Sequence, residues 1–191
     1  MTATILEWQA MSPEEREIEC AGWSVHDNDG LAIVYSVASK LVRESSISIL
    51  DITVGRGNFD VWFIDAWVLE SDLDRVVQPG RVDGFEVSYR VGHDRSGGKL
   101  GVTFDEWVSL SEHEREELLL TWNSDAREGF DIVLRVAAKL VEDSDTSIID
   151  VNCLLVRGTW YIHALVSRGS DLGRLPSNCF GVRVFWSEWW D

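Results

Sequence analysis

One segment of the sequence occurs twice, with the two copies 99 positions apart, and this duplication limits the fold more than any other feature. Trp23 and Gly30 of the first copy correspond to Trp122 and Gly129 of the second. The chain of 191 residues therefore divides into two similar units of roughly 90 residues, each large enough to bury a small core but only marginally stable alone.

Both units carry signals for two helices. Apolar residues recur at steps of three and four over residues 31–42 and 130–141, which is the stripe of a helix with one buried face. Residues 12–15 (Ser-Pro-Glu-Glu) and 111–114 (Ser-Glu-His-Glu) have the pattern of a capping box, in which the side chains of the first and fourth residues each accept a hydrogen bond from the other's backbone N–H. An earlier helix is therefore expected to start at each of these serines.

Each copy then contains three segments typical of strands, because β-branched and aromatic residues dominate them. The expected strands are 47–54, 59–68 and 85–91 in the first copy, and 146–155, 160–166 and 180–186 in the second. The constant offset fails around the first hairpin, which indicates a β-bulge or a hairpin of different length in one copy.

The fold class predicted from this order is α+β, as a tandem duplication of a helix-helix-strand-strand-strand unit with antiparallel sheets. The predicted organisation is a first α+β repeat over residues 1–92, a linker over residues 93–101 and a second α+β repeat over residues 102–191. The two repeats either pair their edge strands into one sheet or pack through their helices, and the sequence leaves both arrangements open.

Composition excludes several classes of partner. A net charge of −16 repels phosphate backbones and anionic lipids, so neither direct nucleic-acid binding nor membrane binding is expected, whereas a basic protein would be attracted. No apolar run approaches the ~20 residues of a membrane-spanning helix, and the start of the chain has no signal-peptide pattern. The three cysteines are widely spaced without a C-x-x-C pair, which indicates reduced thiols and a cytoplasmic location.

Two arrangements of residues suggest chemistry, and each has a simpler structural interpretation. Cys153 and His163 fall on neighbouring predicted strands, as a nucleophile and its base would, or as a core thiol beside a surface histidine. Asp51 and Asp65 lie on adjacent predicted strands as paired carboxylates, and Asp150 repeats Asp51; rim capping or ion pairing also explains these acids. Metal-binding motifs such as H-E-x-x-H are absent, so no metal and no cofactor are expected.

The ten tryptophans are the second unusual feature. Trp8 and Trp107 precede the first expected helix of each repeat and should pack against it. Further tryptophans lie on the returning strands and in the last six residues, and the tryptophan-rich end is the harder one to bury. Intramolecular packing, contact with a partner and carbohydrate stacking are the alternatives for this aromatic set. The candidate binding residues are Trp62, Asp65, Trp67, Asp51, Asp150, Trp160, His163, Trp186, Trp189 and Trp190.

The leading hypothesis is a small acidic cytosolic protein-binding module, such as an inhibitor, an immunity-like protein or a DNA mimic, that docks a sheet face onto a basic protein. The alternative is an enzyme or a small-ligand-binding protein with a cleft between the repeats that contains Asp51, Asp150 or His163. A third hypothesis is a structural repeat that forms a homodimer, so the oligomeric state, monomer or homodimer, stays open.

Overall fold

The computed structural model describes residues 3–23, 28–56, 62–76, 80–92, 102–122, 129–157 and 159–189. The first repeat contains α1 (Ile5–Ala10), α2 (Pro13–Ala21), α3 (Asn28–Glu44), β1 (Ile49–Arg56), β2 (Trp62–Val68), α4 (Glu70–Leu73), β3 (Gly80–Val82) and β4 (Phe85–Val91). The second contains α5 (Phe104–Ser109), α6 (Glu112–Thr121), α7 (Phe130–Glu142), β5 (Ile148–Val156), β6 (Thr159–Val166), a 3₁₀ turn (Leu172–Arg174), β7 (Asn178–Cys179) and β8 (Val182–Glu188). Residues 93–101, where a linker was expected, lie outside the described residues.

The α+β class and the tandem duplication are confirmed. The strands form two four-stranded sheets with equivalent orders, β1-β2-β4-β3 and β5-β6-β8-β7. Within each sheet one pair differs from the antiparallel expectation, because β2 runs parallel to β4 and β6 runs parallel to β8. The connection from Val68 to Phe85 provides the reason: it is long enough for a crossover, and the short β3 inside it pairs with the far edge of β4.

The change of offset comes from the length of the first hairpin. Arg56 pairs with Trp62 in the first sheet, whereas Val156 pairs with Thr159 in the second, so the second hairpin is tighter. A register shift typical of a bulge does occur, but it precedes Asp51 and Asp150 alike. A bulge shared by both copies cannot change the offset between them.

Each repeat starts with one more helix than the sequence predicted. The capping boxes at Ser12 and Ser111 are present and start α2 and α6. Thr4 and Thr103 form further capping boxes, which start the six-residue helices α1 and α5. Trp8 and Trp107 therefore lie within these short helices rather than before a longer one, and both rings are buried.

The repeated tryptophan and glycine form one packing contact in each unit. A Cβ added to Gly30 would lie 2.9 Å from the ring of Trp23, and a Cβ added to Gly129 would lie 2.5 Å from the ring of Trp122. The glycines therefore leave room for the rings. Trp122 in turn stacks on Trp107 with centroids 5.1 Å apart. The strongest sequence signal of the duplication is thus a core contact.

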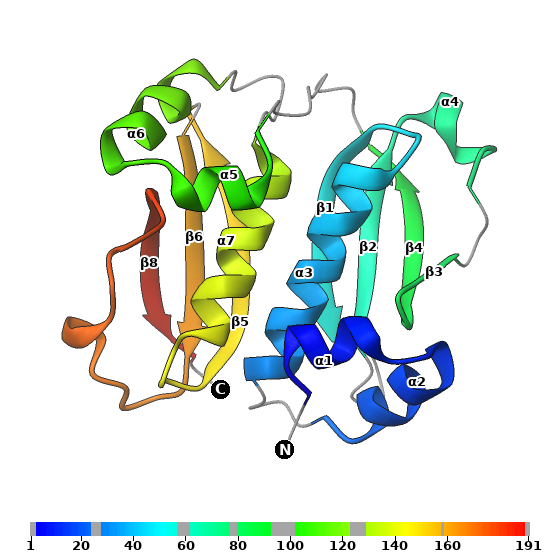
Figure 1. Cartoon of the computed structure of the whole chain (residues 1–191), viewed down its shortest axis with the longest axis horizontal. Coiled ribbons are helices and arrows are strands. Elements are labelled where there is room, and N and C mark those ends of the chain that lie inside the picture. The colour runs from blue at the N-terminus through cyan, green and yellow to red at the C-terminus, as the bar shows by residue number, and fades with distance from the viewer. Residues whose placement is uncertain are drawn as a thin grey trace.

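The two repeats pack through α3 and α7, which lie side by side at the centre of the molecule, with β1 and β5 as the strands nearest to them (Figure 1). Ten of the 13 residues of α7 are buried, as expected for a helix covered on several sides. The buried side chains of both repeats form one cluster. The repeats therefore pack through their helices and do not join their edge strands into one sheet.

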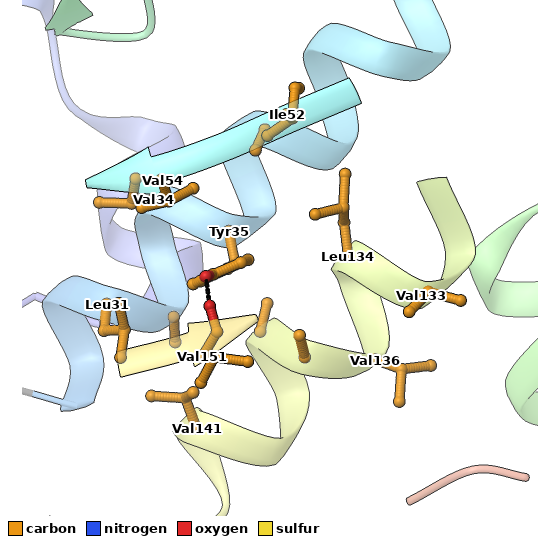
Figure 2. Close-up of a cluster of buried hydrophobic side chains, with 14 of the residues drawn as sticks. Leu31, Val34, Tyr35, Ile52, Val54, Val133, Leu134, Val136, Val141 and Val151 are labelled. Carbon is orange, nitrogen blue, oxygen red and sulfur yellow. Dashed lines mark hydrogen bonds between the residues drawn. The ribbon is translucent and has the colours of Figure 1, made fainter. Parts of the chain in front are cut away.

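Polar side chains of the first repeat also bind the backbone of the second. The buried Tyr35 hydroxyl donates to the carbonyl of Val151 (Figure 2), and Ser39 Oγ donates to the carbonyl of Asp131 at 2.9 Å. The side chain of Asn28 accepts a hydrogen bond from the N–H of Ile148 and donates to the chain just before it. Because β5 is an edge strand, the contacts of Tyr35 and Asn28 satisfy backbone groups at its start and outer edge that β6 does not reach.

Candidate functional site

Helices α3 and α7 cover one face of each sheet, and the opposite side is here called the open face (Figure 1). Side chains alternate between the two faces along every strand, and residues paired across strands share a face. In the first sheet the open face carries Asp51, Thr53, Phe63, Asp65, Trp67, Glu86, Ser88 and Arg90. In the second sheet it carries Asp150, Asn152, Leu154, Tyr161, His163, Leu165, Arg183, Phe185 and Ser187.

The open face of the first sheet brings three candidate binding residues together. Asp51 pairs with Trp67 across β1 and β2, and Asp65 lies two residues before Trp67. Asp65 is only 8% exposed and forms an ion pair with Arg90 at 3.0 Å. The two carboxylates therefore lie on adjacent strands as expected, but Arg90 balances the charge of one of them.

The equivalent position to Asp65 in the second sheet is His163. Its Nε2 lies 2.7 Å from Ser187 Oγ, and its neighbour on β5 is Asn152. The carboxylate of Asp150 accepts hydrogen bonds from the N–H of Val151 and from Asn152 Nδ2. Burial raises the pKa of Asp150, and these hydrogen bonds and the nearby His163 only partly offset that effect. Asp150 and His163 thus share one polar region of the open face.

Beside this polar region lies a group of large side chains called here the aromatic patch, which consists of the exposed Leu154 and Phe185 and the half-buried Tyr161. Leu154 pairs with Tyr161 across β5 and β6, and the rings of Tyr161 and Phe185 are 5.2 Å apart. Leu154 is 42% exposed and Phe185 is 55% exposed. Three large apolar groups therefore face outward from a rigid sheet, where one would expect polar residues if the face only met water.

Three of the other candidate tryptophans, Trp62, Trp160 and Trp186, lie on the faces of the sheets that the helices cover. Trp62 and Trp160 are buried on the faces covered by helices, and Trp160 stacks on Phe130 with centroids 5.2 Å apart. Trp186 is partly buried and its Nε1 donates to the carbonyl of Pro176 at 2.7 Å. Trp189 follows β8 and is 46% exposed, whereas Trp190 lies outside the described residues.

The pairing of Cys153 with His163 as nucleophile and base is wrong. Cys153 lies opposite Ile162 on the covered face, with its Sγ 3.9 Å from the carbonyl of Val133, and His163 points to the open face. Burial raises the pKa of the Cys153 thiol, and it raises the pKa of Cys20 to about 12 and that of Cys179 to about 11. All three side chains are therefore protonated thiols at neutral pH, which are weak nucleophiles.

A cavity of about 480 Å³ lies where the two repeats meet, between α1, α3, α5 and α7. Its charged lining includes Lys40 and Arg43 of α3 and Arg135 of α7, whereas Asp51, Asp150 and His163 do not line it. The space that the ligand-binding hypothesis requires is therefore present, but with residues that sequence reasoning missed. One signal was visible: Arg135 interrupts the apolar run of α7 at the position where the first repeat has Ser36.

Asp83 is the ion-pair partner of two basic side chains that line the cavity. It forms ion pairs with Arg16 at 2.8 Å and with Lys40 at 2.7 Å. Partial burial alone would raise the pKa of Asp83, but the hydrogen bonds and charges of Lys40 and Arg16 together outweigh it and lower the pKa below its ordinary value. With Gly84 it forms a tight turn at positive φ, and the equivalent residue in the second repeat is Phe180.

Replacing Asp83 by asparagine is expected to lower the free energy of unfolding at pH 7 by about 1–2 kcal/mol, because it removes the charge that Arg16 and Lys40 share. Asparagine tolerates the positive φ of this turn. Since the folded pKa is lowered, the carboxylate contributes stability above about pH 4, the ordinary value, and the contribution is lost as the pH falls through the folded pKa.

Urea unfolding at a series of pH values measures both effects. The variant should lose less stability than the wild type on acidification, and the two should converge at low pH. Asp171→Asn is the matched control, because its ion pair with Arg174 at 3.0 Å is exposed to solvent and should contribute little. Parallel pH curves for the wild type and Asp83→Asn would contradict the assignment.

In the ranges that the structure describes, no three His, Cys, Asp or Glu side chains are grouped so as to hold a metal ion. Among those same residues, no helix combines the length and the apolar character needed to cross a membrane. No protein-family model, curated protein or solved structure matches this chain.

Proposed function

We propose that the protein is a small acidic protein-binding module that docks the open face of its second sheet onto a basic partner, as an inhibitor or an immunity-like protein would. The observation that carries this proposal is the aromatic patch of Leu154, Tyr161 and Phe185. Exposed aromatic side chains on a rigid support are typical binding hot spots, because their burial releases water at little cost in conformational entropy.

The charge of the chain favours a basic partner. The net charge is −16, and helices α2 and α6 each carry four glutamates against a single arginine. Such a field steers a basic protein toward the surface and repels acidic competitors, and the aromatic patch then provides the short-range contact. Asp150 lies on the same open face, separated from the patch by Asn152 and His163; it offers a carboxylate to a basic side chain of the partner, and the cost of burying Asp150 would be offset by that pairing.

A reducing compartment fits this proposal. The three cysteines are free thiols, which persist in the cytoplasm, so we propose that the module and its partner are found there.

A second copy of the chain would be the competing occupant of the aromatic patch. Light scattering of the purified protein separates the two cases, since a module that docks onto a different protein is a monomer until that protein is added.

We expect one basic protein to be captured from the native host lysate at low salt and lost at high salt. With that partner purified, raising the ionic strength from about 0.05 M to about 0.5 M should weaken binding at least tenfold, because the long-range attraction is screened. Binding that does not respond to salt would contradict the electrostatic part of the proposal.

The face is tested separately by truncating the patch. Phe185→Ala and Leu154→Ala should each weaken binding about tenfold, the loss of roughly 1–2 kcal/mol of contact energy. Leu120→Ala is the matched control: this side chain is 86% exposed, but it lies on α6, away from the open face, so its truncation should leave the affinity unchanged. Equal effects of Phe185→Ala and Leu120→Ala would mean that the partner binds elsewhere.

A further inference from the structure

The cavity between the repeats has the size and the composition of a site for a small organic ligand. Its volume of about 480 Å³ falls within the range of small-molecule sites. Ile5, Trp8 and Phe104 provide apolar and aromatic walls, and Ser36 and Thr103 provide hydroxyl groups. Both repeats contribute to the lining, so the cavity exists only when they are packed together.

The lining is locally positive in a strongly acidic protein. It contains the four bases Arg16, Lys40, Arg43 and Arg135, and the three carboxylates Glu44, Asp83 and Asp105. The formal charge of the lining is therefore four minus three, or +1, whereas the whole chain carries −16. Since the remaining surface repels anions, a cavity that collects bases is an exception that a bound anion would explain.

Arg135 differs from the other three bases in its partners. Arg16 and Lys40 share Asp83, and Arg43 lies 3.2 Å from Glu44. Among the described residues, no carboxylate comes within ion-pair distance of Arg135; its guanidinium donates to Ser36 Oγ and lies 5.4 Å from the ring centre of Phe104. Burial lowers the pKa of Arg135 and the positive charge of Arg43 acts in the same direction, while the more distant carboxylates of Glu142 and Asp105 only partly offset these effects.

A half-buried guanidinium without a carboxylate at ion-pair distance is costly, because desolvation of its charge is not fully offset by the more distant acids. Arginine has five N–H donors, and the one directed to Ser36 leaves donors for a further acceptor. A planar or tetrahedral oxyanion accepts two such N–H groups at once and neutralises the charge. The equivalent position in the first repeat is Ser36 itself, so the two halves provide one such site and not two.

We infer that the cavity between the repeats binds a small organic oxyanion, a carboxylate or a phosphate ester with an apolar or aromatic body, through the guanidinium of Arg135. The oxyanion contacts Arg135 and the neighbouring Arg43, and the body of the ligand lies against Phe104 and Trp8. This site is separate from the open face, and it stands whether or not the chain binds a protein partner.

Phenyl phosphate and benzoate are suitable probes, since each joins an oxyanion to an aromatic body, and benzyl alcohol is the uncharged comparison. Titration of the full chain at constant ionic strength, followed by heteronuclear NMR, should give saturable shifts at Phe104 and Arg135 with both anions. Benzyl alcohol should bind at least tenfold more weakly. Inorganic phosphate alone should bind more weakly than phenyl phosphate, because it lacks the apolar contact.

Arg135→Gln should weaken the binding of phenyl phosphate at least tenfold. Arg43→Gln should weaken it several-fold and provides the test if Arg135→Gln does not fold, because the Arg43 side chain is 43% exposed. Arg183→Gln removes the same charge from the open face, outside the cavity, and should leave the affinity for phenyl phosphate unchanged. No saturable binding of either anion, equal binding of benzyl alcohol, or full affinity in both Arg135→Gln and Arg43→Gln would overturn the inference.

Discussion

Replacing Gly129 by alanine is expected to destabilise the folded protein by about 2–5 kcal/mol, from two costs at the same atom. Gly129 has a φ of +77°, in the left-handed region that an L-residue adopts at a cost of ~1–2 kcal/mol. The added methyl carbon would also lie 2.5 to 2.6 Å from three ring atoms of Trp122. That ring is 6% exposed and stacked on Trp107, so it has little room to move, and overpacking of this kind costs ~1–3 kcal/mol.

Two further glycines separate these costs. Gly169 has a φ of +87° with no atom within 4 Å of an added Cβ, so Gly169→Ala should show the backbone cost alone. Gly30 lies inside α3 without a positive φ, but its Cβ would lie 2.9 Å from Trp23; Gly30→Ala should show the clash, reduced by about 1 kcal/mol of gained helix propensity. Urea unfolding measures all three. A loss at Gly129 no greater than that at Gly169 would show that Trp122 moves aside freely.

Features that depend on local sequence patterns could be predicted. The duplication, the long helices and most strands were predictable, because they depend on local periodicity and on residues such as Ser12 and Ser111 that form caps with their own neighbours. The six-residue helices α1 and α5 were missed, although Thr4 and Thr103 carry the same capping pattern; their few residues show too little periodicity to be recognised.

The parallel pairing of β2 with β4 was not predictable from these signals. A strand segment carries information about its own alternation, but its neighbour is decided by the crossover between them and by β3. The same limit applies to the candidate site. Trp62 and Trp67 look equivalent in the sequence, yet five positions along a strand place them on opposite faces, so one is in the core and the other on the open face.

The cavity was the least predictable feature. Phe104 and Arg135 belong to one repeat and Arg43 to the other, and they come together only because α3 packs on α7. The divergence of Ser36 and Arg135 at equivalent positions was visible in the sequence, but its meaning required knowing that the two side chains meet each other at the repeat interface. Comparison of the two repeats identifies Arg135 as different, and the packing of α3 on α7 shows that it lines a cavity.

A chain of residues 1–92 alone is expected not to form a stable monomer, which is the largest effect considered for this protein. Without the second repeat, α3 would lose the cover of α7 along its length, and the Tyr35 hydroxyl and Ser39 would lose their buried acceptors on Val151 and Asp131. Each large apolar side chain returned to water costs ~1.5–3 kcal/mol, so a few of them equal the ~5–15 kcal/mol by which a typical domain is stable.

The half-chain has one way to restore this cover, and it makes the prediction specific. The two repeats are equivalent, so a second copy of residues 1–92 can place its own α3 where α7 lies, with Ser36 meeting Ser36 in place of Arg135. Far-UV circular dichroism with sedimentation at several concentrations should therefore find an unfolded monomer at low concentration and a weak dimer at high concentration. Adding residues 102–191 should restore folded structure in a one-to-one complex. A monomer of residues 1–92 that unfolds cooperatively with the stability of the full chain would show that α3 does not need α7, and that the shared core is only a contact between two independent domains.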